Sequence, residues 1–197
     1  MFFFTADLHF GDNEIIERES RPFGDVSEFE DAFVKNVNDV TSKDDILYIL
    51  GDWINYNKTN RHTQEEIRET LEICKRLTPK VILIDGNNEQ RAIEEIYGGD
   101  FEKFRSLAKE CGFADFVRKA DVEFEGKRYH LIHHPKDYEK GVLNLFGHTH
   151  RGTGLWKPFG FNMCVDLNYF RPFSQEDIYK LLKMKEWWDN DPDTHCM

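Results

Sequence analysis

Short apolar runs alternate with segments of helical periodicity along the whole chain. Five of these runs are only four or five residues long, which is typical of buried strands rather than of helices. They span Met1 to Thr5, Ile46 to Leu50, Val81 to Ile84, Tyr129 to Ile132 and Leu143 to Phe146. Residues 161–165 are a further strand candidate, and residues 122–124 are predicted to pair with 128–132 in a hairpin across Glu125-Gly126-Lys127.

Capping boxes predict where three of the helices begin. In such a box a Ser or Thr caps the first turn, and an acidic residue near the third position reaches back to the cap. The pairs are Ser27 with Glu30, Thr63 with Glu66, and Ser174 with Asp177. Residues 89–97 and 101–111 also have helical patterns, and each of these segments is followed by a glycine that can end a helix.

This alternation of strands and helices predicts an α/β protein, and the hairpin implies that at least one sheet is not purely parallel. No internal repeat, low-complexity tract or linker-like segment interrupts the chain. We therefore expect a single domain over residues 1–197, with a polar tail at 189–197 that is expected to be disordered.

Side chains able to bind a metal follow each of the five apolar runs. In α/β proteins, ligands gather in the crevice beyond the carboxyl ends of the strands, so residues that are distant in sequence can converge there. The segments are Asp7-Leu8-His9, Gly51-Asp52, Asn87-Asn88-Glu89, His133-His134 and His148-Thr149-His150.

Each of these motifs also has an ordinary structural interpretation. A lone Asp-x-His after a strand is more often a turn or helix-start sequence than a ligand pair, and Gly-Asp and Gly-Asn are common turn sequences. The pair His133-His134 before Pro135 fits a plain loop, whereas His148 and His150, two apart at a strand end, can face one site. Five such signals, each directly after an apolar run, are hard to obtain by chance.

The net charge of the chain argues against some classes of binding partner. Its 197 residues include 26 basic and 37 acidic side chains, which gives a formal net charge of −11. This excess argues against broad capture of nucleic acid or of an anionic membrane. It does not exclude a phosphate substrate, because charges beyond a Debye length of about 8 Å are screened and a bound divalent cation dominates the local field.

The sequence also predicts a soluble, cytoplasmic protein with reduced thiols. No apolar run approaches the roughly 20 residues of a membrane span, and the N-terminus lacks the basic region of a signal peptide. The cysteines are far apart and form no CxxC pair, which argues against disulfides and against a zinc site built on thiolates. They are Cys74, Cys111, Cys164 and Cys196.

The order of the motifs, Asp-x-His, Gly-Asp, Gly-Asn-x-Glu, His and Gly-His-x-His, resembles the calcineurin-like metallophosphoesterase superfamily. From Thr5 to about Ile178 the chain is similar to small bacterial and phage members that begin with Asp-x-His-Phe-Gly, here residues 7–11. Arg21-Pro22-Phe23 and the segment 165–169 fit the same group. The resemblance implies a four-layer α/β/β/α sandwich with two mixed sheets and a dinuclear metal site at the carboxyl edge of the strands.

The resemblance also implies the ligands of two metal ions, with Asp52 bridging them. The first ion would be held by Asp7, His9, Asp52 and His150, and the second by Asp52, Asn87, His133 and His148. The position of Pro135 favours His133 over His134 as the ligand. Carboxylate, amide and imidazole donors without thiolate suit Mn, Fe, Zn or Ni more than Cu(I). Mn²⁺ is the expected metal, with Fe, Zn or Ni as alternatives.

Two such cations explain how an ester could be hydrolysed without a protein nucleophile. A water shared by both ions has its pKa lowered from about 15.7 to roughly 7, which makes hydroxide available for attack on phosphorus. The sequence therefore predicts a hydrolase of small phosphodiesters or phosphomonoesters, with phosphodiesters favoured. The alternatives are a catalytically silent binding platform that keeps the fold, and a nuclease, which the acidic charge disfavours.

Two residues depart from the pattern of the family. Asn88 stands where the superfamily usually has His, and an amide cannot protonate a leaving oxygen near pH 7. His134 is a candidate to supply the missing imidazole, the alternative being that it only packs or caps its loop. Asp12 stands where close relatives carry His, and its role is left open. Arg61 and His62, on a polar segment after Asp52, are the candidates for substrate binding.

Overall fold

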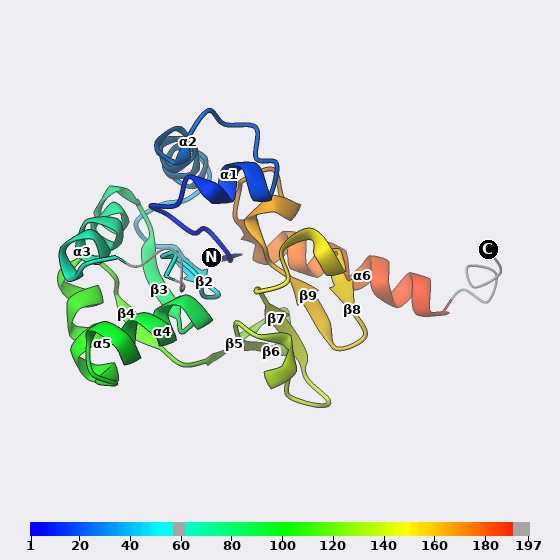
Figure 1. Cartoon of the computed structure of the whole chain (residues 1–197). Helices are drawn as coiled ribbons and strands as arrows, with labels where there is room; N and C mark the ends of the chain where they lie inside the picture. Colours follow the sequence, from blue (N-terminus) through cyan, green and yellow to red (C-terminus); the bar gives the residue numbers. More distant parts are fainter. Residues whose placement is uncertain (57–61, 191–197) are drawn as a thin grey trace.

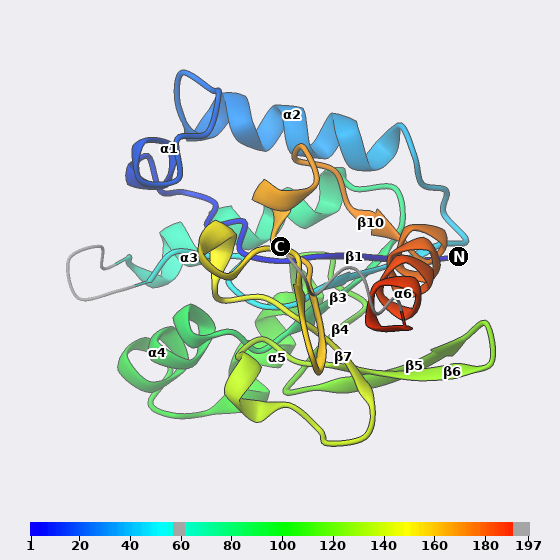
Figure 2. The same cartoon turned by 90° about the vertical axis from the view of Figure 1, so that its right-hand side faces the viewer.

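Two five-stranded mixed sheets lie face to face at the centre of the molecule (Figure 1 and Figure 2). The computed structural model describes residues 1–56 and 62–190. The first sheet has the order β10-β1-β2-β3-β4, in which β1 to β4 are parallel and β10 is antiparallel. Its strands are β1 (Phe2–Thr5), β2 (Ile46–Ile49), β3 (Lys80–Ile84), β4 (Asp115–Val117) and β10 (Phe173–Ser174).

The second sheet has the order β5-β6-β7-β9-β8, and only its three central strands are parallel. Its strands are β5 (Ala120–Phe124), β6 (Lys127–Leu131), β7 (Leu143–Phe146), β8 (Trp156–Lys157) and β9 (Gly160–Asn162). The predicted hairpin is β5-β6. Its loop is two residues long, since Phe124 pairs directly with Lys127, and Glu125 and Gly126 both have positive φ angles, as a type I′ turn requires.

Helices occupy most of the remaining chain. The α-helices are α1 (Glu14–Arg18), α2 (Val26–Asn38), α3 (Gln64–Glu72), α4 (Asn87–Ile96), α5 (Phe101–Glu110) and α6 (Gln175–Asn190). Short 3₁₀ helices are η1 (Ile73–Arg76), η2 (Pro135–Asp137), η3 (His150–Thr153) and η4 (Val165–Leu167). None of the helices in residues 1–56 and 62–190 is both long and apolar enough to cross a membrane.

Successive side chains along a strand point to opposite faces of the sheet, so the buried residues of the first sheet belong to two different clusters. In the first sheet, Phe3 and Leu47 belong to the cluster that contains the buried faces of α1 to α5. Their neighbours Phe4 and Tyr48 belong to the other cluster, together with residues of the second sheet and of α6. The first sheet is therefore buried on both faces, as its near-continuous apolar runs predict.

The expected α/β architecture with two mixed sheets is confirmed, and all five predicted strands are present. The box at Thr63 is confirmed, and Ser174 and Asp177 exchange the expected hydrogen bonds. The helix expected to begin at Ser27 instead has Asp25 as its N-cap, because the Asp25 carboxylate accepts the Glu28 N–H. Helix α6 continues through Asn190, so the first two residues of the expected tail are helical and the others lie outside the described residues.

Glycines at two strand ends allow the sheets to approach closely. Gly51, after β2, has a φ of +86°, and a Cβ there would lie 2.4 Å from His133 Nδ1. At Gly86, after β3, a Cβ would lie 2.3 Å from the backbone nitrogen of Asp52. A side chain at either position would force the carboxyl ends of the strands apart.

Gly51→Ala is therefore expected to lower the free energy of unfolding by about 3 kcal/mol or more, because backbone strain and overpacking act together. Gly98→Ala is the matched control, since Gly98 also has a positive φ but has open space around its Cβ position. It should cost only about 1 to 2 kcal/mol. Urea unfolding of both variants measures the difference, and equal losses would contradict the close approach.

Candidate metal centre

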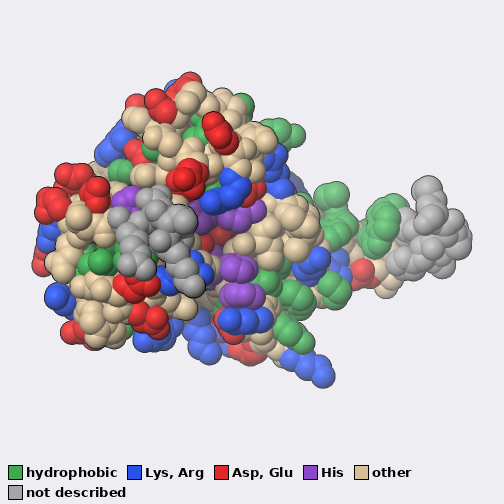
Figure 3. Space-filling view, viewed as in Figure 1, with side chains coloured by type: hydrophobic (Ala, Val, Ile, Leu, Met, Phe, Trp, Pro, Cys, Tyr) green, Lys and Arg blue, Asp and Glu red, His purple; other side chains and the backbone are tan. Residues whose placement is uncertain are grey.

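All seven predicted metal ligands lie on segments that directly follow strands. Asp7 and His9 follow β1, and Asp52 follows β2, all in the first sheet. Asn87 is the first residue of α4, after β3, while the remaining three, His133, His148 and His150, follow β6 and β7 of the second sheet. The histidines gather at the centre of one face of the molecule (Figure 3).

The first group of donors contains Asp7, His9 and His150, whose ligand atoms lie within 4.8 Å of one another. The Nε2 atoms of His9 and His150 are 3.2 Å apart. His9 Nε2 also lies 3.6 Å from Asp52 Oδ2. This is the set that the resemblance assigns to the first metal ion.

Asp52, His133 and His148 form the second group, again with ligand atoms within 4.8 Å of one another. His133 Nε2 lies 3.2 Å from His148 Nδ1 and 3.5 Å from Asp52 Oδ1. The amide oxygen of Asn87 is 3.0 Å from His133 Nε2 and 2.7 Å from His148 Nδ1. Asp52 Oδ2 thus faces the first group and Asp52 Oδ1 faces the second, which is the geometry expected of a bridging carboxylate.

Five of the seven predicted ligands share an uncommon backbone conformation. Nine residues other than glycine have positive φ angles in the described part of the chain, and five of them are predicted ligands. These five are Asp7 (60°), His9 (54°), Asp52 (56°), His148 (72°) and His150 (44°). Each such residue costs about 1 to 2 kcal/mol, and strain of this kind clusters at functional sites.

Burial sets the charge of the site. Asp7 is fully buried, which raises the pKa of its carboxyl, and Asp52 is 3% exposed. Burial also lowers the pKa of His9 to about 3 and that of His148 to about 4. At neutral pH both imidazoles are therefore uncharged and keep a lone pair that can bind a metal.

Divalent transition-metal ions fit these donors. Imidazole nitrogens and carboxylate oxygens from different segments point at common positions, and no thiolate is among them. His133 Nδ1 donates to the Leu50 carbonyl at 2.8 Å, which leaves the lone pair on Nε2, the atom that faces Asp52 and Asn87. A second hydrogen bond of this kind is what fixes a metal-binding histidine in its tautomer.

A buried ion pair holds the first group in place. The Arg21 guanidinium donates to both carboxylate oxygens of Asp166 at 2.9 Å, and to the backbone carbonyls of Asp7 and Leu8 at 2.8 Å. Asp166 Oδ2 lies 3.8 Å from His150 Nδ1. The pair therefore joins the segment after β1 to the histidine that follows β7.

A buried carboxyl group supports Asp52, the predicted bridging ligand. Glu89 accepts hydrogen bonds from the backbone N–H groups of Gly86 and of residues 52–54. Burial and the nearby Asp52 carboxylate raise the pKa of Glu89 to about 8, whereas the N–H donors favour its charged form. These bonds fix the turn that presents Asp52.

Cys164 lies beside His150 and Asp166, and these three could in principle bind an ion. Burial raises the pKa of the Cys164 thiol well above its usual range, so the thiol stays protonated. Its sulfur donates to Asp166 Oδ2 at 3.2 Å. Cys74 and Cys111 are also buried free thiols, while Cys196 lies outside the described residues.

Asn88, at the position of the family's usual His, and His134, the candidate to replace that imidazole, both lie at the predicted metal centre. The Asn88 amide donates to Asp52 Oδ2 at 2.6 Å and accepts the Tyr56 N–H. His134 stacks on His148, with ring centroids 4.1 Å apart. The Nδ1 atom of His134 accepts the Lys136 N–H, and burial together with Lys136 lowers the pKa of this imidazole.

Other candidates from the sequence lie elsewhere. His62 Nδ1 is 4.0 Å from Glu66 at the start of α3, and Arg61 lies outside the described residues. Asp12 is buried and accepts the N–H of Glu14 at the start of α1, so its carboxylate has a structural partner.

Sequence reasoning missed two arginines. Arg18 and Arg91 border a cavity of about 230 Å³ together with His9, Asp52, Asn87, Asn88, His148 and His150. Arg91 follows Asn87 by four positions on α4, a spacing that places both on one face of the helix and could have revealed it. Arg18 ends the five-residue helix α1, whose side-chain direction is not readable from sequence.

Comparisons with known proteins agree with this geometry. A family model, the calcineurin-like phosphoesterases, matches residues 1–196. The chain is 28% identical over 192 residues to an uncharacterized protein of Methanocaldococcus jannaschii, MJ1445, covering 92% of this chain and 90% of that one. A solved structure from Aquifex aeolicus, AQ665, a protein of unknown function, matches with a TM-score of 0.62 and 25% identity, covering 92% of this chain and 98% of the other. The chain thus belongs to the calcineurin-like phosphoesterase family.

Proposed function

We propose that this protein is a dinuclear metal-dependent phosphoesterase that hydrolyses small phosphate esters in the cytoplasm, with phosphodiesters preferred over phosphomonoesters. The observation that carries the proposal is the position of Asp52, whose two oxygens face two separate groups of buried donors. Membership of the family supports the reaction class.

The two metal ions are assigned to the two groups. Asp7, His9 and His150 would hold the first, Asn87, His133 and His148 the second, and Asp52 both. Mn²⁺ is the expected metal, with Fe, Zn or Ni as alternatives. When bound, the ions would supply Lewis-acid polarisation of the phosphoryl group and a water acidic enough to attack it.

Residues of the chain itself would bind and orient the ester. Arg18 and Arg91 border the cavity over the metal ligands and would contact the non-bridging phosphate oxygens. Arg61 and His62 stay candidates for substrate contacts farther from the centre. In this role Arg91 is favoured, because it shares one helix face with Asn87.

Asn88 and His134 would act on the leaving group through hydrogen bonds rather than by proton transfer. The Asn88 amide has no acidic proton near neutral pH, and Nδ1 of His134 is occupied as an acceptor, which leaves the proton on Nε2. Such a site favours esters whose leaving oxygen is stable as an anion.

The other two functions have weaker support. A silent binding platform would tolerate damage to the ligands, but all seven positions carry competent side chains. A nuclease would need a basic track, whereas the chain carries a net charge of −11.

Removal of the metals or of the bridging ligand is expected to abolish turnover. Asp52→Asn or His150→Ala should lower hydrolysis of bis(p-nitrophenyl) phosphate by more than about 100-fold and reduce bound metal, with the circular dichroism spectrum unchanged. Asp44→Asn, an exposed acid before β2, is the control and should behave as wild type. The proposal fails if no chromogenic monoester or diester is hydrolysed in a chelator-sensitive way with Mn²⁺.

Asn88→His is expected to change the dependence on the leaving group. Restoring an imidazole should raise turnover of alkyl esters about tenfold or more and leave aryl esters nearly unchanged, because only the alkoxide needs a proton. Steady-state kinetics on a matched alkyl and aryl pair provide the measurement. A similar increase for both esters would contradict the assigned role of Asn88.

A further inference from the structure

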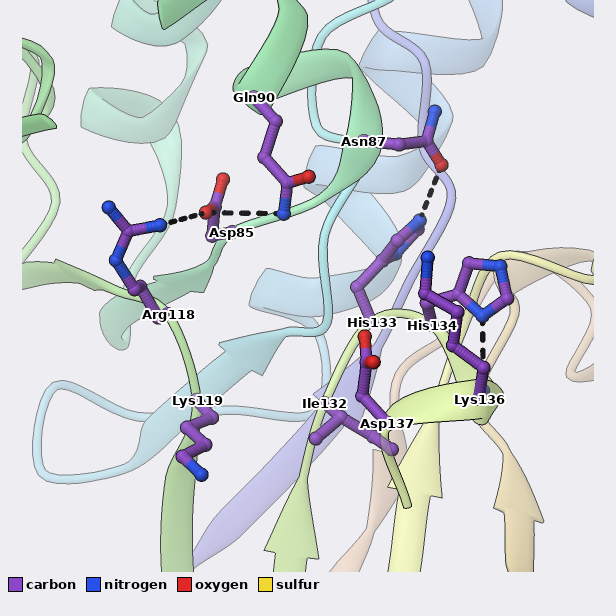
Figure 4. Close-up of a pocket in the computed structure, with 10 residues that line it drawn as sticks. All are labelled: Asp85, Asn87, Gln90, Arg118, Lys119, Ile132, His133, His134, Lys136 and Asp137. Carbon is purple, nitrogen blue, oxygen red and sulfur yellow. Dashed lines mark hydrogen bonds and ion pairs between the residues drawn. The ribbon is translucent and has the colours of Figure 1, made fainter. Parts of the chain in front are cut away.

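A second, larger cavity adjoins the metal centre, and the basic side chains that border it have no part in the assignment above. Its volume is about 390 Å³, within the range of roughly 300 to 1,000 Å³ that small-molecule sites occupy. Asn87 and His133, both predicted ligands of the second metal ion, border it on one side (Figure 4). A substrate held at that ion could therefore extend into this cavity.

Charged side chains from three segments border the rest of the cavity. The connection between β4 and β5 contributes Arg118 and Lys119, η2 contributes Lys136 and Asp137, and the segment after β3 contributes Asp85. Basic residues thus outnumber acidic ones here, although acids exceed bases in the chain as a whole. Gln90, His134 and Ile132 complete the lining.

The Asp85 carboxylate is part of the cavity wall and does not point freely into the cavity. Asp85 is buried, and its carboxylate accepts from Gln90 Nε2 at 3.3 Å and lies 3.5 Å from the Arg118 guanidinium (Figure 4). Arg118 is placed further by the ring of Phe101, whose centroid is 4.4 Å away. This fixed arrangement keeps an arginine at one side of the cavity.

Lys136 lies on another side, and its ammonium makes no ion pair with any residue in 1–56 or 62–190. Its side chain extends from η2 in the direction of His133 (Figure 4). The acid beside it, Asp137, is exposed and has no ion pair within the same described ranges. Bound cations at the second metal position would add further positive potential at this edge.

We propose that this cavity binds a second phosphate of the substrate, linked through oxygen to the phosphorus that is attacked, with Arg118 and Lys136 as its contacts. The inference deepens the proposed function and rests on it. In the reaction, water supplies a hydroxyl to the attacked phosphorus, the P–O bond to the second phosphate breaks, and its electron pair stays on that oxygen. The water proton passes to solvent.

The chemistry of the neighbouring Asn88 agrees with such a substrate. A phosphate leaves as a stable anion and needs no proton, so the lack of an acid at Asn88 costs little. An alkoxide leaving group would need that proton. The charged cavity and the missing acid are separate observations that favour the same class, the phosphoanhydrides.

Binding of unreactive probes tests the inference without turnover. Isothermal titration calorimetry on the Mn²⁺-loaded protein would compare methylenediphosphonate, which has two linked phosphonates, with methylphosphonate, which has one. The double variant Arg118→Ala/Lys136→Ala should weaken diphosphonate binding about tenfold or more and leave monophosphonate binding unchanged. Asp137→Asn should tighten diphosphonate binding, because it removes an opposing charge.

Lys80→Ala is the matched control, since Lys80 is an exposed lysine at the opposite, amino end of β3 and should change neither affinity. Metal content measured on each sample separates loss of affinity from extraction of Mn²⁺ by the probe. Equal weakening of both probes, or an unchanged ratio in the double variant, would overturn the second-phosphate site.

The two proposals fail in different ways. If the protein prefers the diphosphonate through Arg118 and Lys136 but hydrolyses no ester or anhydride, the proposed function is wrong while the binding site stands. If chelator-sensitive hydrolysis of diesters persists but the probe preference is absent, the second-phosphate site is wrong and the proposed function stands.

Discussion

Two carboxylates buried in one site impose the constraint around which this fold is organised. Asp7 and Asp52 have almost no contact with solvent, and burial of isolated charges costs several kcal/mol each unless opposite charge is nearby. The protein supplies imidazoles around them, and burial keeps His9 and His148 neutral at physiological pH. Burial alone would lower the pKa of His133 as well, but the carboxylates of Asp52 and Asp7 raise it. The imidazoles offset only part of the negative charge of two buried carboxylates, and divalent cations would offset the rest.

The strained backbone around this site is held in place by buried hydrogen bonds. Five predicted ligands adopt left-handed backbone angles that L-residues avoid, and such a conformation persists only where the surroundings determine it. Here the Arg21–Asp166 pair fixes the carbonyls of the segment after β1, and Glu89 fixes the turn after β2. Gly51 and Gly86 remove the side chains that would keep these turns apart. Arg21, Asp166 and Glu89, which are outside the predicted ligand set, thus hold the segments that carry the ligands.

Much of this could be predicted from sequence because two signals coincide. The apolar runs indicate where strands end, and a parallel strand end is where ligands gather, so residues as distant as Asp7 and His150 were expected to meet. The left-handed angles could not be predicted, since they depend on contacts with residues far away in the sequence, such as Arg21 and Glu89, rather than on local propensity. Two-residue strands such as β8 and β10 carry no periodicity. The cap at Asp25 was missed because Ser27 and Glu30 also match a capping box, whereas in the structure the Asp25 carboxylate accepts the Glu28 N–H.

The two cavities that meet at Asn87 connect the geometry with specificity. The smaller one covers the metal ligands and is bordered by Arg18 and Arg91, while the larger one opens beside His133 and is bordered by Arg118 and Lys136. A substrate that filled only the first would gain nothing from the second pair of cations. A substrate with two linked phosphates would place negative charge in both cavities. Its leaving phosphate would need no proton, so the lack of an acid at Asn88 would cost little. The net charge of −11 does not conflict with an anionic substrate, because distant charges are screened and basic side chains border both cavities.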